Sequence, residues 1–329
     1  MSILSTPLKI GNLEFRNRVF LAPMSGVSDL PFRLRSWQAG AGMVVSEMVA
    51  SAELCSGALE SQMRINGAGL TQHVVQLAGR EAQWMAKAAI IVQDCHADMI
   101  DINMGCPAKK VIGGYSGAAL MRDLELAMSL IEAVLKVAKI PVSLKMRLGW
   151  DEKNINAPKL AKLAEEAGIS MITVHGRTRM QFYNGKADWD ALARVREAIS
   201  IPMVANGDIA NRTDAEECLI RSGADAVMVG RASYGAPWLA GEIAGHLFNK
   251  KNLVSYICSH YQAMLDYYGE HTGIRHARKH LDWYLQKHAN GAYSDEERRE
   301  IMTSRQPEYV FSMINSIFSR DLCNPEKAA

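Results

Sequence analysis

The sequence predicts an α/β fold, a (β/α)8 TIM barrel followed by a small C-terminal domain made of helices. Two observations favour this fold. Short apolar segments alternate with helical patterns eight times before about residue 250, and no β-hairpin lies between them, as expected for parallel strands covered on both faces. After this point the strand patterns stop. We therefore expect a barrel over residues 1–250 and a helical domain over residues 251–329.

The eight expected strands are runs of apolar residues, which are typical of buried strands. A short hairpin over residues 8–15 precedes them. An open, doubly wound sheet is the alternative, and it is less favoured because the first strand is not followed by a Gly-x-Gly-x-x-Gly turn. The expected strands cover residues 19–24, 43–48, 72–79, 99–104, 140–146, 171–176, 201–207 and 226–231.

Several expected helices have recognisable starts. Ser28 or Asp29 caps the first helix, and Asp123 caps another. The patterns Thr213-x-x-Glu216 and Ser294-x-x-Glu297 predict capping boxes. The expected helices start near residue 31 and cover residues 81–93, 124–135, 159–167, 189–199, 213–223, 253–268, 274–288, 295–303 and 309–318.

The composition is that of an ordinary globular protein. Apolar residues make up 48% of the 329 residues and charged residues 22%, with a net charge of +2, so a nucleic-acid partner would need a local basic patch. The six cysteines include no Cys-x-x-Cys pair, which fits a reducing cytosol better than a disulfide framework or a zinc knuckle. The N-terminus lacks a signal-peptide pattern, and no apolar run approaches about 20 residues. We therefore expect a cytoplasmic protein without a membrane span.

Nearly every expected strand ends in a polar residue. In barrels the working side chains sit at the carboxyl ends of the strands, which meet at one face. Solvation alone does not easily explain so many polar ends, so this face is the predicted site. The polar residues there are Ser25, Glu47, Gln76, Asn103, Lys145, Arg147, His175, Arg177, Asn206, Asp208 and Arg231.

Two strand ends have the composition of a phosphate site. The seventh strand ends in Asn206-Gly207-Asp208 and the eighth in Gly230-Arg231. Glycine lets backbone N–H groups approach an anion, and barrels bind phosphates at these two loops. The alternative is that the glycines make tight turns and nothing more. That explanation is weaker for the pair than for either glycine alone.

Three further side chains suit a flat heterocyclic ligand. Lys145 lies on a buried strand and needs a partner; it could be a Schiff-base nucleophile, the partner of a ring with partial negative charge, or a lysine that reaches the barrel rim. Gln76 can both donate and accept. His175 is equally well explained as a buried histidine or as a ligand contact. No carboxylate pair indicates glycoside hydrolysis, and no His-x-x-x-His or similar cluster indicates a metal.

Cys106 lies just past the end of the fourth expected strand, between Gly105 and Pro107. Three explanations are open: a space-filling residue, a covalent nucleophile, or a proton donor. The loop position and the nearby Lys109 and Lys110 favour a function. A nucleophile usually needs an adjacent base, which the sequence does not show, whereas a proton donor needs reach and a suitable pKa.

Seven segments together resemble the flavin-dependent tRNA-dihydrouridine synthases, most closely the bacterial B type. Asn-Met-Gly-Cys-Pro at residues 103–107 and His-Gly-Arg-Thr at residues 175–178 are specific in combination. The resemblance continues into the helical tail at residues 277–285. It implies a barrel that binds FMN and a C-terminal helical domain that helps to hold tRNA. The matching segments are residues 22–33, 76–79, 101–111, 144–150, 174–178, 205–209 and 230–232.

The resemblance implies roles for individual residues in binding the cofactor. Gln76 and Lys145 would bond the polar edge of the flavin, with Lys145 near the N1/O2 side and His175 in support. The other implied contacts are the backbone of Pro23, Met24 and Ser25 along the ring, and Asn206, Gly207, Asp208, Gly230 and Arg231 at the phosphate.

The resemblance also implies contacts with the substrate. Cys106 would be the proton donor, and Asn103, Arg147 and Arg177 would face the uracil. Residues 112–115 are less polar than in the B type, which leaves the behaviour of this loop as a lid open. The residues expected to contact tRNA are Lys109, Lys110, Arg177 and Arg179 on the barrel rim and Arg275, Arg278, Lys279 and Lys287 in the tail.

The implied reaction reduces a uridine of the tRNA D-loop, by analogy the one at position 17, to 5,6-dihydrouridine. NADPH would reduce FMN, the flipped-out uracil would take a hydride from flavin N5 at C6, and Cys106 would protonate C5. One rival is another FMN barrel that acts on a small molecule such as a dihydropyrimidine or an enone, but the basic loop and tail argue against it. The other is an RNA-binding or regulatory protein on an inactive barrel, but the intact Cys106, Lys145 and phosphate site argue against it. We expect a monomer.

Overall fold

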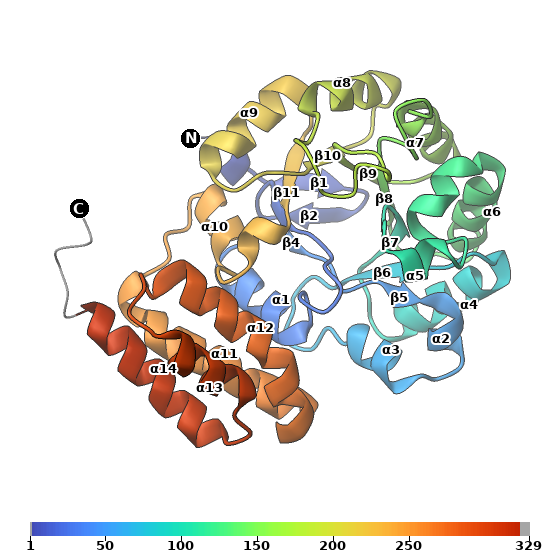
Figure 1. Ribbon diagram of the computed structural model, residues 1–329. Helices are drawn as coiled ribbons and strands as arrows, with labels where there is room; N and C mark the ends of the chain where they lie inside the picture. Colours follow the sequence, from blue (N-terminus) through green and yellow to red (C-terminus); the bar gives the residue numbers. More distant parts are fainter. Residues whose placement is uncertain (1, 323–329) are drawn as a thin grey trace. The chain divides into compact units, whose positions relative to one another are not determined.

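The computed structural model describes residues 2–322, which form two compact units (Figure 1). The barrel unit runs to Ala232 and includes Trp238–His246. The helical unit comprises Ser233–Pro237 and the described chain from Leu247 onward. The segment Ser233–Pro237, which precedes the expected boundary at residue 250, therefore groups with the helices. The assignment of separate functions to the two parts stays a prediction.

Parallel strands form the barrel, which confirms the predicted fold class (Figure 1). Their order in the sheet is β4-β3-β11-β10-β9-β8-β7-β6-β5. The strands are β3 (Val19–Leu21), β4 (Met43–Val44), β5 (Val49–Ala50), β6 (Val74–Ala78), β7 (Met99–Met104), β8 (Val142–Arg147), β9 (Met171–His175), β10 (Met203–Asn206) and β11 (Ala226–Val229).

One segment closes the barrel, and it differs from the single strand predicted over residues 43–48. Its first part, β4, pairs with β3, whereas Val45 bridges to Val74 and β5 pairs with β6. Between the two parts, the hydroxyl of Ser46 donates to Glu47 O and accepts the backbone N–H of Gln76. This side chain takes the place of ladder hydrogen bonds, so the strand is split.

Helices follow the strands around the barrel, and most begin where the sequence predicts. Asp29 caps α1, Asp123 caps α6, and Ser294 forms the predicted capping box of α13. The short helices α2, α3, α5 and α10 have no counterpart in the prediction. The helices are α1 (Leu30–Gln38), α2 (Ser51–Cys55), α3 (Leu59–Arg64), α4 (Ala82–Asp94), α5 (Lys109–Ile112), α6 (Leu124–Leu135), α7 (Ala157–Ala167), α8 (Trp189–Ala198), α9 (Arg212–Ser222), α10 (Leu239–Ala244), α11 (Leu253–Tyr268), α12 (Glu270–His288), α13 (Asp295–Thr303) and α14 (Pro307–Leu322).

The start of α9 differs from the prediction. The sequence pattern places a capping box at Thr213 and Glu216, but the helix begins at Arg212. Asn211 caps it, because the side-chain oxygen of Asn211 accepts the backbone N–H of Asp214 at 2.9 Å. The predicted capping box is therefore wrong.

An apolar plug fills the amino end of the barrel. The hairpin of β1 (Leu8–Ile10) and β2 (Leu13–Phe15) contributes Leu8, Ile10 and Phe15 to this core. These side chains pack with residues at the starts of strands, so the amino end is sealed against water. The polar residues of the strands therefore line the carboxyl end of the barrel. The strand-start residues of the plug include Val74, Met99, Met171 and Ala226.

The helical unit contains a close contact between α11 and α12. A Cβ on Gly273 would lie 2.6 Å from Met264 O, so α12 needs a glycine where it meets α11. Deeper in the unit, Tyr284 OH and His260 Nδ1 lie 2.9 Å apart. These contacts join α11 to α12.

Gly241 of α10 provides a test of the packing in the barrel unit. A Cβ at this position would lie 1.8 Å from Ala39 O. In an unpacked helix Gly→Ala stabilises by about 1 kcal/mol. Here we expect Gly241→Ala to lower the free energy of unfolding by about 2 kcal/mol or more, because α10 must move. Urea and thermal unfolding measure the change.

Gly168→Ala is the control for this substitution. No atom of the described residues lies within 4 Å of the added Cβ, but φ is 116°. We expect this strain alone to cost about 1 kcal/mol. A Gly241→Ala variant as stable as the wild type would show that α10 does not pack this tightly.

Candidate active site

The carboxyl ends of the strands bring the predicted site residues together. The strand register aligns Asn103 with Lys145, Arg147 with His175, and His175 with Asn206. Neighbouring strands lie about 5 Å apart, so these residues share one end of the barrel. The polar strand ends are therefore one cluster and not unrelated features.

Lys145 lies partly buried in the middle of this cluster. Its ammonium group donates to Asn206 Oδ1 at 3.1 Å, and Asn206 Nδ2 donates to Met228 O at 2.8 Å, which fixes the orientation of the amide. Burial lowers the pKa of Lys145 to about 8, and the charge of Asp101 opposes this shift. Lys145 is thus still mostly charged at neutral pH, and it would gain from a partner with negative charge.

His175 is neutral and surrounded by positive charge. Burial lowers its pKa well below the usual value, and the charges of Lys145, Arg147, Arg177 and Arg231 lower it further. A guanidinium nitrogen of Arg177 lies 3.3 Å from Nε2 of the ring. Because a guanidinium only donates, Nε2 accepts, and the ring proton is on Nδ1. Four cations around a neutral imidazole make this end of the barrel attractive to an anion.

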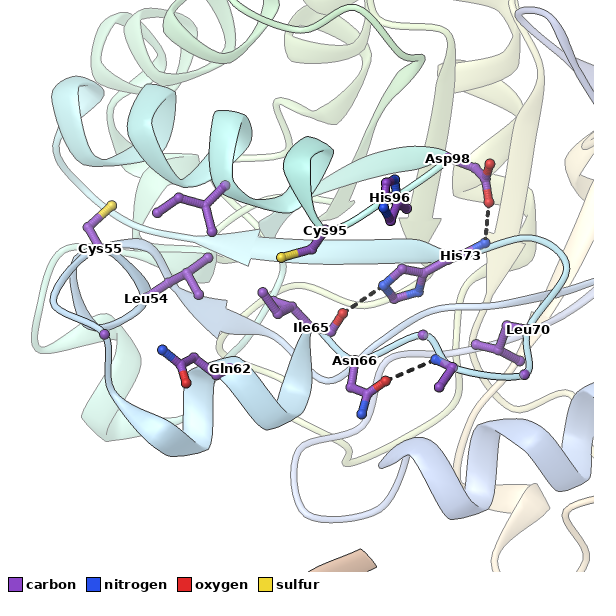
Figure 2. Close-up of a pocket in the computed structure, with 15 residues that line it drawn as sticks. Leu54, Cys55, Gln62, Ile65, Asn66, Leu70, His73, Cys95, His96 and Asp98 are labelled. Carbon is purple, nitrogen blue, oxygen red and sulfur yellow. Dashed lines mark hydrogen bonds between the residues drawn. The ribbon is translucent and has the colours of Figure 1, made fainter.

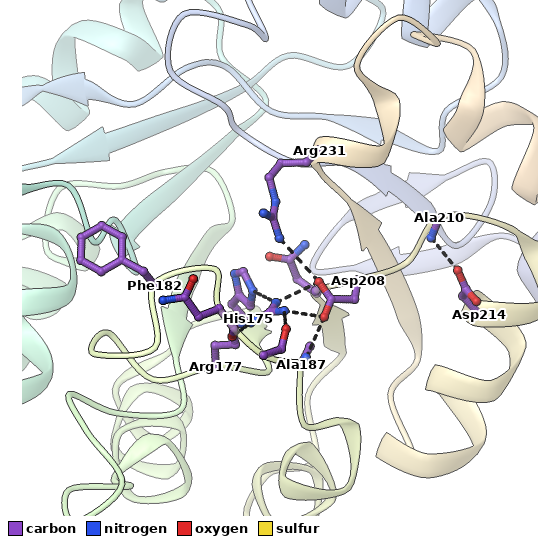
Figure 3. Close-up of polar contacts among 12 residues, drawn as sticks. His175, Arg177, Phe182, Ala187, Asp208, Ala210, Asp214 and Arg231 are labelled. Atoms are coloured by element: carbon purple, nitrogen blue, oxygen red, sulfur yellow. Dashed lines mark hydrogen bonds and ion pairs between the residues drawn. The ribbon is translucent and has the colours of Figure 1, made fainter. Parts of the chain in front are cut away.

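An ion pair between a buried arginine and a partly exposed aspartate joins the ends of β9 and β10 (Figure 3). Arg177, which is 1% exposed, donates to the two oxygens of Asp208 at 2.9 and 2.6 Å. The carboxylate also accepts the backbone N–H of Ala187 at 2.7 Å, and Arg231 lies 3.5 Å away. Burial opposes ionisation, but these partners hold the pKa of Asp208 below its usual range. The sequence places Asp208 among the phosphate contacts, and that role stays a prediction.

The two buried arginines also hold the loop that follows β9. Arg147 donates to Thr178 O and Phe182 O, both at 2.8 Å. Arg177 donates to Gly185 O at 2.6 Å. Each side chain is 1% exposed. The expectation that they face a substrate ring stays a prediction, and these contacts indicate a role in supporting the loop.

Cys106 lies half-buried on the loop after β7. The side-chain oxygen of Asn103 accepts the backbone N–H groups of Gly105 at 3.1 Å and Cys106 at 3.0 Å, which fixes the turn. Arg147 donates to Gly105 O at 2.9 Å from the neighbouring strand. Burial raises the pKa of the thiol, and a backbone hydrogen bond and two nearby cations oppose the shift. The thiol therefore keeps its proton at neutral pH.

Buried polar side chains connect this loop to the barrel interior. Gln76 Nε2 donates to Asp101 Oδ2 at 2.6 Å, and Asn103 Nδ2 donates to Gln76 Oε1 at 2.7 Å. Ser143 Oγ donates to the other oxygen of Asp101 at 2.6 Å. Asp101 and Ser143 are absent from the predicted site. The sequence does contain a signal for Asp101, because it stands two residues before Asn103 on an apolar strand and faces the same way.

The loops after β10 and β11 each begin with a glycine, Gly207 buried and Gly230 partly buried. Gly207 has φ 121°, and a Cβ there would lie 3.0 Å from the ring of His175. A Cβ on Gly230 would lie 3.9 Å from Ala22 and 4.0 Å from Met24 Sδ. The chain therefore needs a glycine at Gly207, whereas a Cβ on Gly230 would make only ordinary van der Waals contacts. Gly230 thus adjoins the loop of Pro23, Met24 and Ser25.

Tyr183 adds an aromatic ring that the sequence does not predict. It is 46% exposed, and the guanidinium groups of Arg231 and Arg147 lie 4.4 and 5.5 Å from the centre of its ring. The ring of His175 lies 6.3 Å away. Tyr183 belongs to an irregular loop, so no periodic pattern identifies it as part of the site.

The predicted tRNA contacts lie in both units. Lys109 and Lys110 begin α5 and are exposed. In the helical unit Arg275 is exposed and Lys279 is partly buried. Arg278 donates to two backbone carbonyls at the end of α13, at 3.2 and 3.3 Å. Their contacts with RNA stay a prediction.

A cavity of about 820 Å³ lies elsewhere in the barrel unit (Figure 2). It is lined by residues of α2, α3 and α4 and by His73 and Asp98, which precede β6 and β7. Asp98 accepts the backbone N–H of His73 at 2.7 Å, and His73 Nε2 lies 2.8 Å from Ile65 O. Burial lowers the pKa of His73 to about 4. The cavity is near the amino ends of the strands and shares no residue with the predicted site.

Residues 2–322 contain neither a candidate metal-binding group nor a candidate membrane span. In this range no three His, Cys, Asp or Glu side chains are grouped so that they could hold a metal. None of the helices that the structure describes is both long and apolar enough to cross a membrane.

Known proteins resemble the chain over most of its length. The family model of the dihydrouridine synthases (Dus) matches residues 20–317. The chain belongs to the dihydrouridine synthase family. A probable tRNA-dihydrouridine synthase of Rhizobium leguminosarum bv. phaseoli is 60% identical over 299 residues, which cover 91% of this chain and 94% of the relative. The tRNA-dihydrouridine synthase B of Xanthomonas axonopodis pv. citri is 44% identical over 87% of this chain and 89% of the relative.

A solved structure shares the fold of this dihydrouridine synthase family member. The old yellow enzyme homologue from Zymomonas mobilis has a TM-score of 0.52 and 15% identity, over 72% of this chain and 90% of that chain. Family membership confirms the predicted oxidoreductase and supports a flavin cofactor. The site fits a flavin, because a cationic cluster lies beside the glycine-containing loops at Gly207 and Gly230.

Asp208→Ala should destabilise this dihydrouridine synthase at neutral pH. The substitution leaves the buried guanidinium of Arg177 without its carboxylate, so we expect a loss of about 2 kcal/mol in the free energy of unfolding. The pKa of Asp208 is lowered in the folded protein, so its contribution is present above about pH 4 and is lost as the pH falls through the lowered value. Unfolding by urea at several pH values should show the gap to wild type narrowing in acid.

Asp190→Ala is the matched control. Asp190 makes the same two-bond contact with Arg221, at 2.9 and 2.6 Å, but on the exposed surface. Its removal should change stability little. Equal effects of the two substitutions would mean that the Asp208 pair has no special structural role.

Proposed function

We propose that this chain reduces uridine in tRNA to 5,6-dihydrouridine, with bound FMN and with NADPH as the reductant. Family membership and relatives named as tRNA-dihydrouridine synthases support the reaction. The observation that carries the proposal is the placement of a protonated thiol, Cys106, on a loop beside the cationic strand-end cluster. That cluster suits an anionic cofactor, and the thiol suits proton transfer.

The strand-end residues suit FMN in particular. Its phosphate needs positive charge and backbone N–H groups, which Arg231, Gly207 and Gly230 would supply. Lys145 and Gln76 would bond the polar edge of the ring. Bound FMN, reduced by NADPH, would supply a hydride for C6 of the uracil. The other proposed cofactor contacts are Pro23, Met24, Ser25, His175 and Asn206.

Cys106 would complete the reduction by protonating C5. Hydride addition at C6 leaves a negative charge on the uracil, and the S–H proton moves to C5 as the C5–H bond forms. The thiolate left behind would be stabilised by Arg147 and Lys145, whose charges favour the ionised form of this group. Solvent then restores its proton. Asn103 would face the uracil from the end of β7.

Arg147, Arg177 and Asp208 are better explained as supports than as ligand contacts. Both arginines donate to backbone carbonyls of the loop after β9, Arg147 also donates to Gly105 O, and Asp208 pairs with Arg177. We infer that they keep that loop, with Tyr183, at the mouth of the barrel. The roles that the resemblance implies for these three residues stay predictions.

A cluster of arginine and aromatic side chains suits RNA. The guanidinium of Arg179 lies 4.9 Å from the ring centre of Trp150 and 4.8 Å from that of Phe182. Arg122 lies 4.8 Å from Trp150. Such planar groups stack on unpaired bases and contact phosphates. Lys109, Lys110, Arg275, Arg278 and Lys279 would add phosphate contacts. Modification of position 17, a monomeric state and a cytoplasmic location stay predictions.

Cys106→Ala should remove most of the chemistry and leave cofactor binding intact. Without the proton donor, we expect single-turnover reduction of uridine in unmodified tRNA to slow by about 100-fold or more. The flavin content per chain, measured by absorbance and by chromatography of the released cofactor, should match the wild type. Cys95→Ala is the control, because Cys95 is an exposed thiol in the cavity of Figure 2, and it should react at the wild-type rate.

Two outcomes would contradict the proposal at different levels. Reduction at full rate by Cys106→Ala would reject the role of the thiol. Wild-type protein that holds flavin but forms no dihydrouridine with NADPH and unmodified tRNA would reject the reaction itself.

Arg179→Ala should weaken tRNA binding and its dependence on salt. If the side chain contacts a phosphate, log Kd against log salt should lose roughly one unit of slope. Fluorescence anisotropy with labelled tRNA at several salt concentrations measures both values. Arg221→Ala removes an exposed arginine of α9 and should leave both values unchanged. Equal affinity and slope in Arg179→Ala would remove this residue from the RNA contacts.

A further inference from the structure

A line of hydrogen bonds runs from a buried carboxylate to the backbone of the thiol loop. Asp101 accepts from Gln76, Gln76 accepts from Asn103, and Asn103 accepts from the N–H groups of Gly105 and Cys106. Asp101, Gln76 and Asn103 are 3%, 1% and 7% exposed. Water therefore cannot readily replace a partner that is lost.

The direction of every bond in this line follows from Asp101. A carboxylate only accepts, so the amide of Gln76 must turn its nitrogen toward it. Gln76 Oε1 then faces Asn103, which must present its nitrogen to that oxygen. The oxygen of Asn103 is left to face the loop, where it accepts the N–H groups of Gly105 and Cys106. If either amide turned over, two donors or two acceptors would face each other in the barrel interior.

We infer that Asp101 is a positioning residue that sets the place of the Cys106 thiol through Gln76 and Asn103. The inference deepens the proposed function, because it gives the position of the proton donor a cause. Asp101 is too deeply buried to reach the substrate. Ser143 holds the other oxygen of Asp101 at 2.6 Å, and it fixes the start of the line without being part of it.

Two substitutions at Asp101 separate hydrogen-bond direction from charge. Asp101→Asn can keep the line, because its oxygen can face Gln76 while its nitrogen donates to the hydroxyl of Ser143, which can also accept. Asp101→Leu has a similar size but no acceptor. Gln76→Met breaks the line at its second member. Ser143→Ala leaves the bond between Asp101 and Gln76 in place and is the matched control.

The readout is the alkylation rate of Cys106 by iodoacetamide in the full-length protein as purified, followed by peptide mass spectrometry from pH 7 to 9. This rate depends on the exposure and pKa of the thiol and not on turnover. Cys95, an exposed thiol, is the internal reference. Cys218 is fully buried and reports unfolding, since it should stay unmodified in any variant that folds.

We expect Asp101→Leu and Gln76→Met each to speed Cys106 alkylation by about fivefold or more, as the loss of one buried hydrogen bond would. Asp101→Asn and Ser143→Ala should stay within about twofold of the wild type. The double variant Asp101→Leu/Gln76→Met should be no faster than either single variant, because both act through one line.

Three results would overturn the inference. The first is a wild-type or slower rate in folded Asp101→Leu. The second is an Asp101→Asn variant that behaves like Asp101→Leu, which would make charge and not direction the cause. The third is multiplied effects in the double variant. The assay contains neither NADPH nor tRNA, so the proposed reaction could fail while this inference holds, and the reverse.

Discussion

Charge buried at the carboxyl end of the barrel is the constraint on which the rest of the site depends. Lys145, Arg147 and Arg177 reach into a region that water enters little, and two carboxylates, Asp101 and Asp208, oppose them. A buried charge must be paired or must lose its ionisation. Here the arginines find carbonyls and a carboxylate, Lys145 has its pKa lowered to about 8, and His175 stays neutral. The positive charge that remains attracts an anion.

The two ends of the barrel contribute differently to folding and to function. Apolar residues at the strand starts pack around the β1–β2 hairpin and seal the amino end. The carboxyl end uses hydrogen bonds where the amino end uses packing. Arg147 and Arg177 hold the loop after β9 in place by hydrogen bonds to its carbonyls. Asn103 holds the turn that carries Cys106 by accepting a backbone N–H of that turn. The groups proposed to bind and to transfer a proton are therefore held before any ligand arrives.

Much of this arrangement could be predicted from the sequence, because it depends on local patterns. Apolar runs identify the strands, and parallel strands bring their polar ends to one face. The split at Ser46, the cap at Asn211 and the partners of Arg147 could not be predicted in this way. Each depends on which of several possible hydrogen-bond partners a side chain takes, and for Ser46 and Arg147 the partner lies far away in the sequence. Asp101 is intermediate, because its position on the strand was visible but its partner Gln76 lies 25 residues earlier.

A crystal structure of the protein with FMN bound would test the proposed arrangement of this site most directly. We expect the FMN phosphate to lie within hydrogen-bond distance, about 3 Å, of Arg231 and of the backbone at Gly207 or Gly230. We also expect the polar edge of the flavin ring to lie beside Lys145, with the Cys106 thiol facing the space above the ring. A phosphate bound away from these two glycine loops, or a thiol turned away from the ring, would contradict this arrangement.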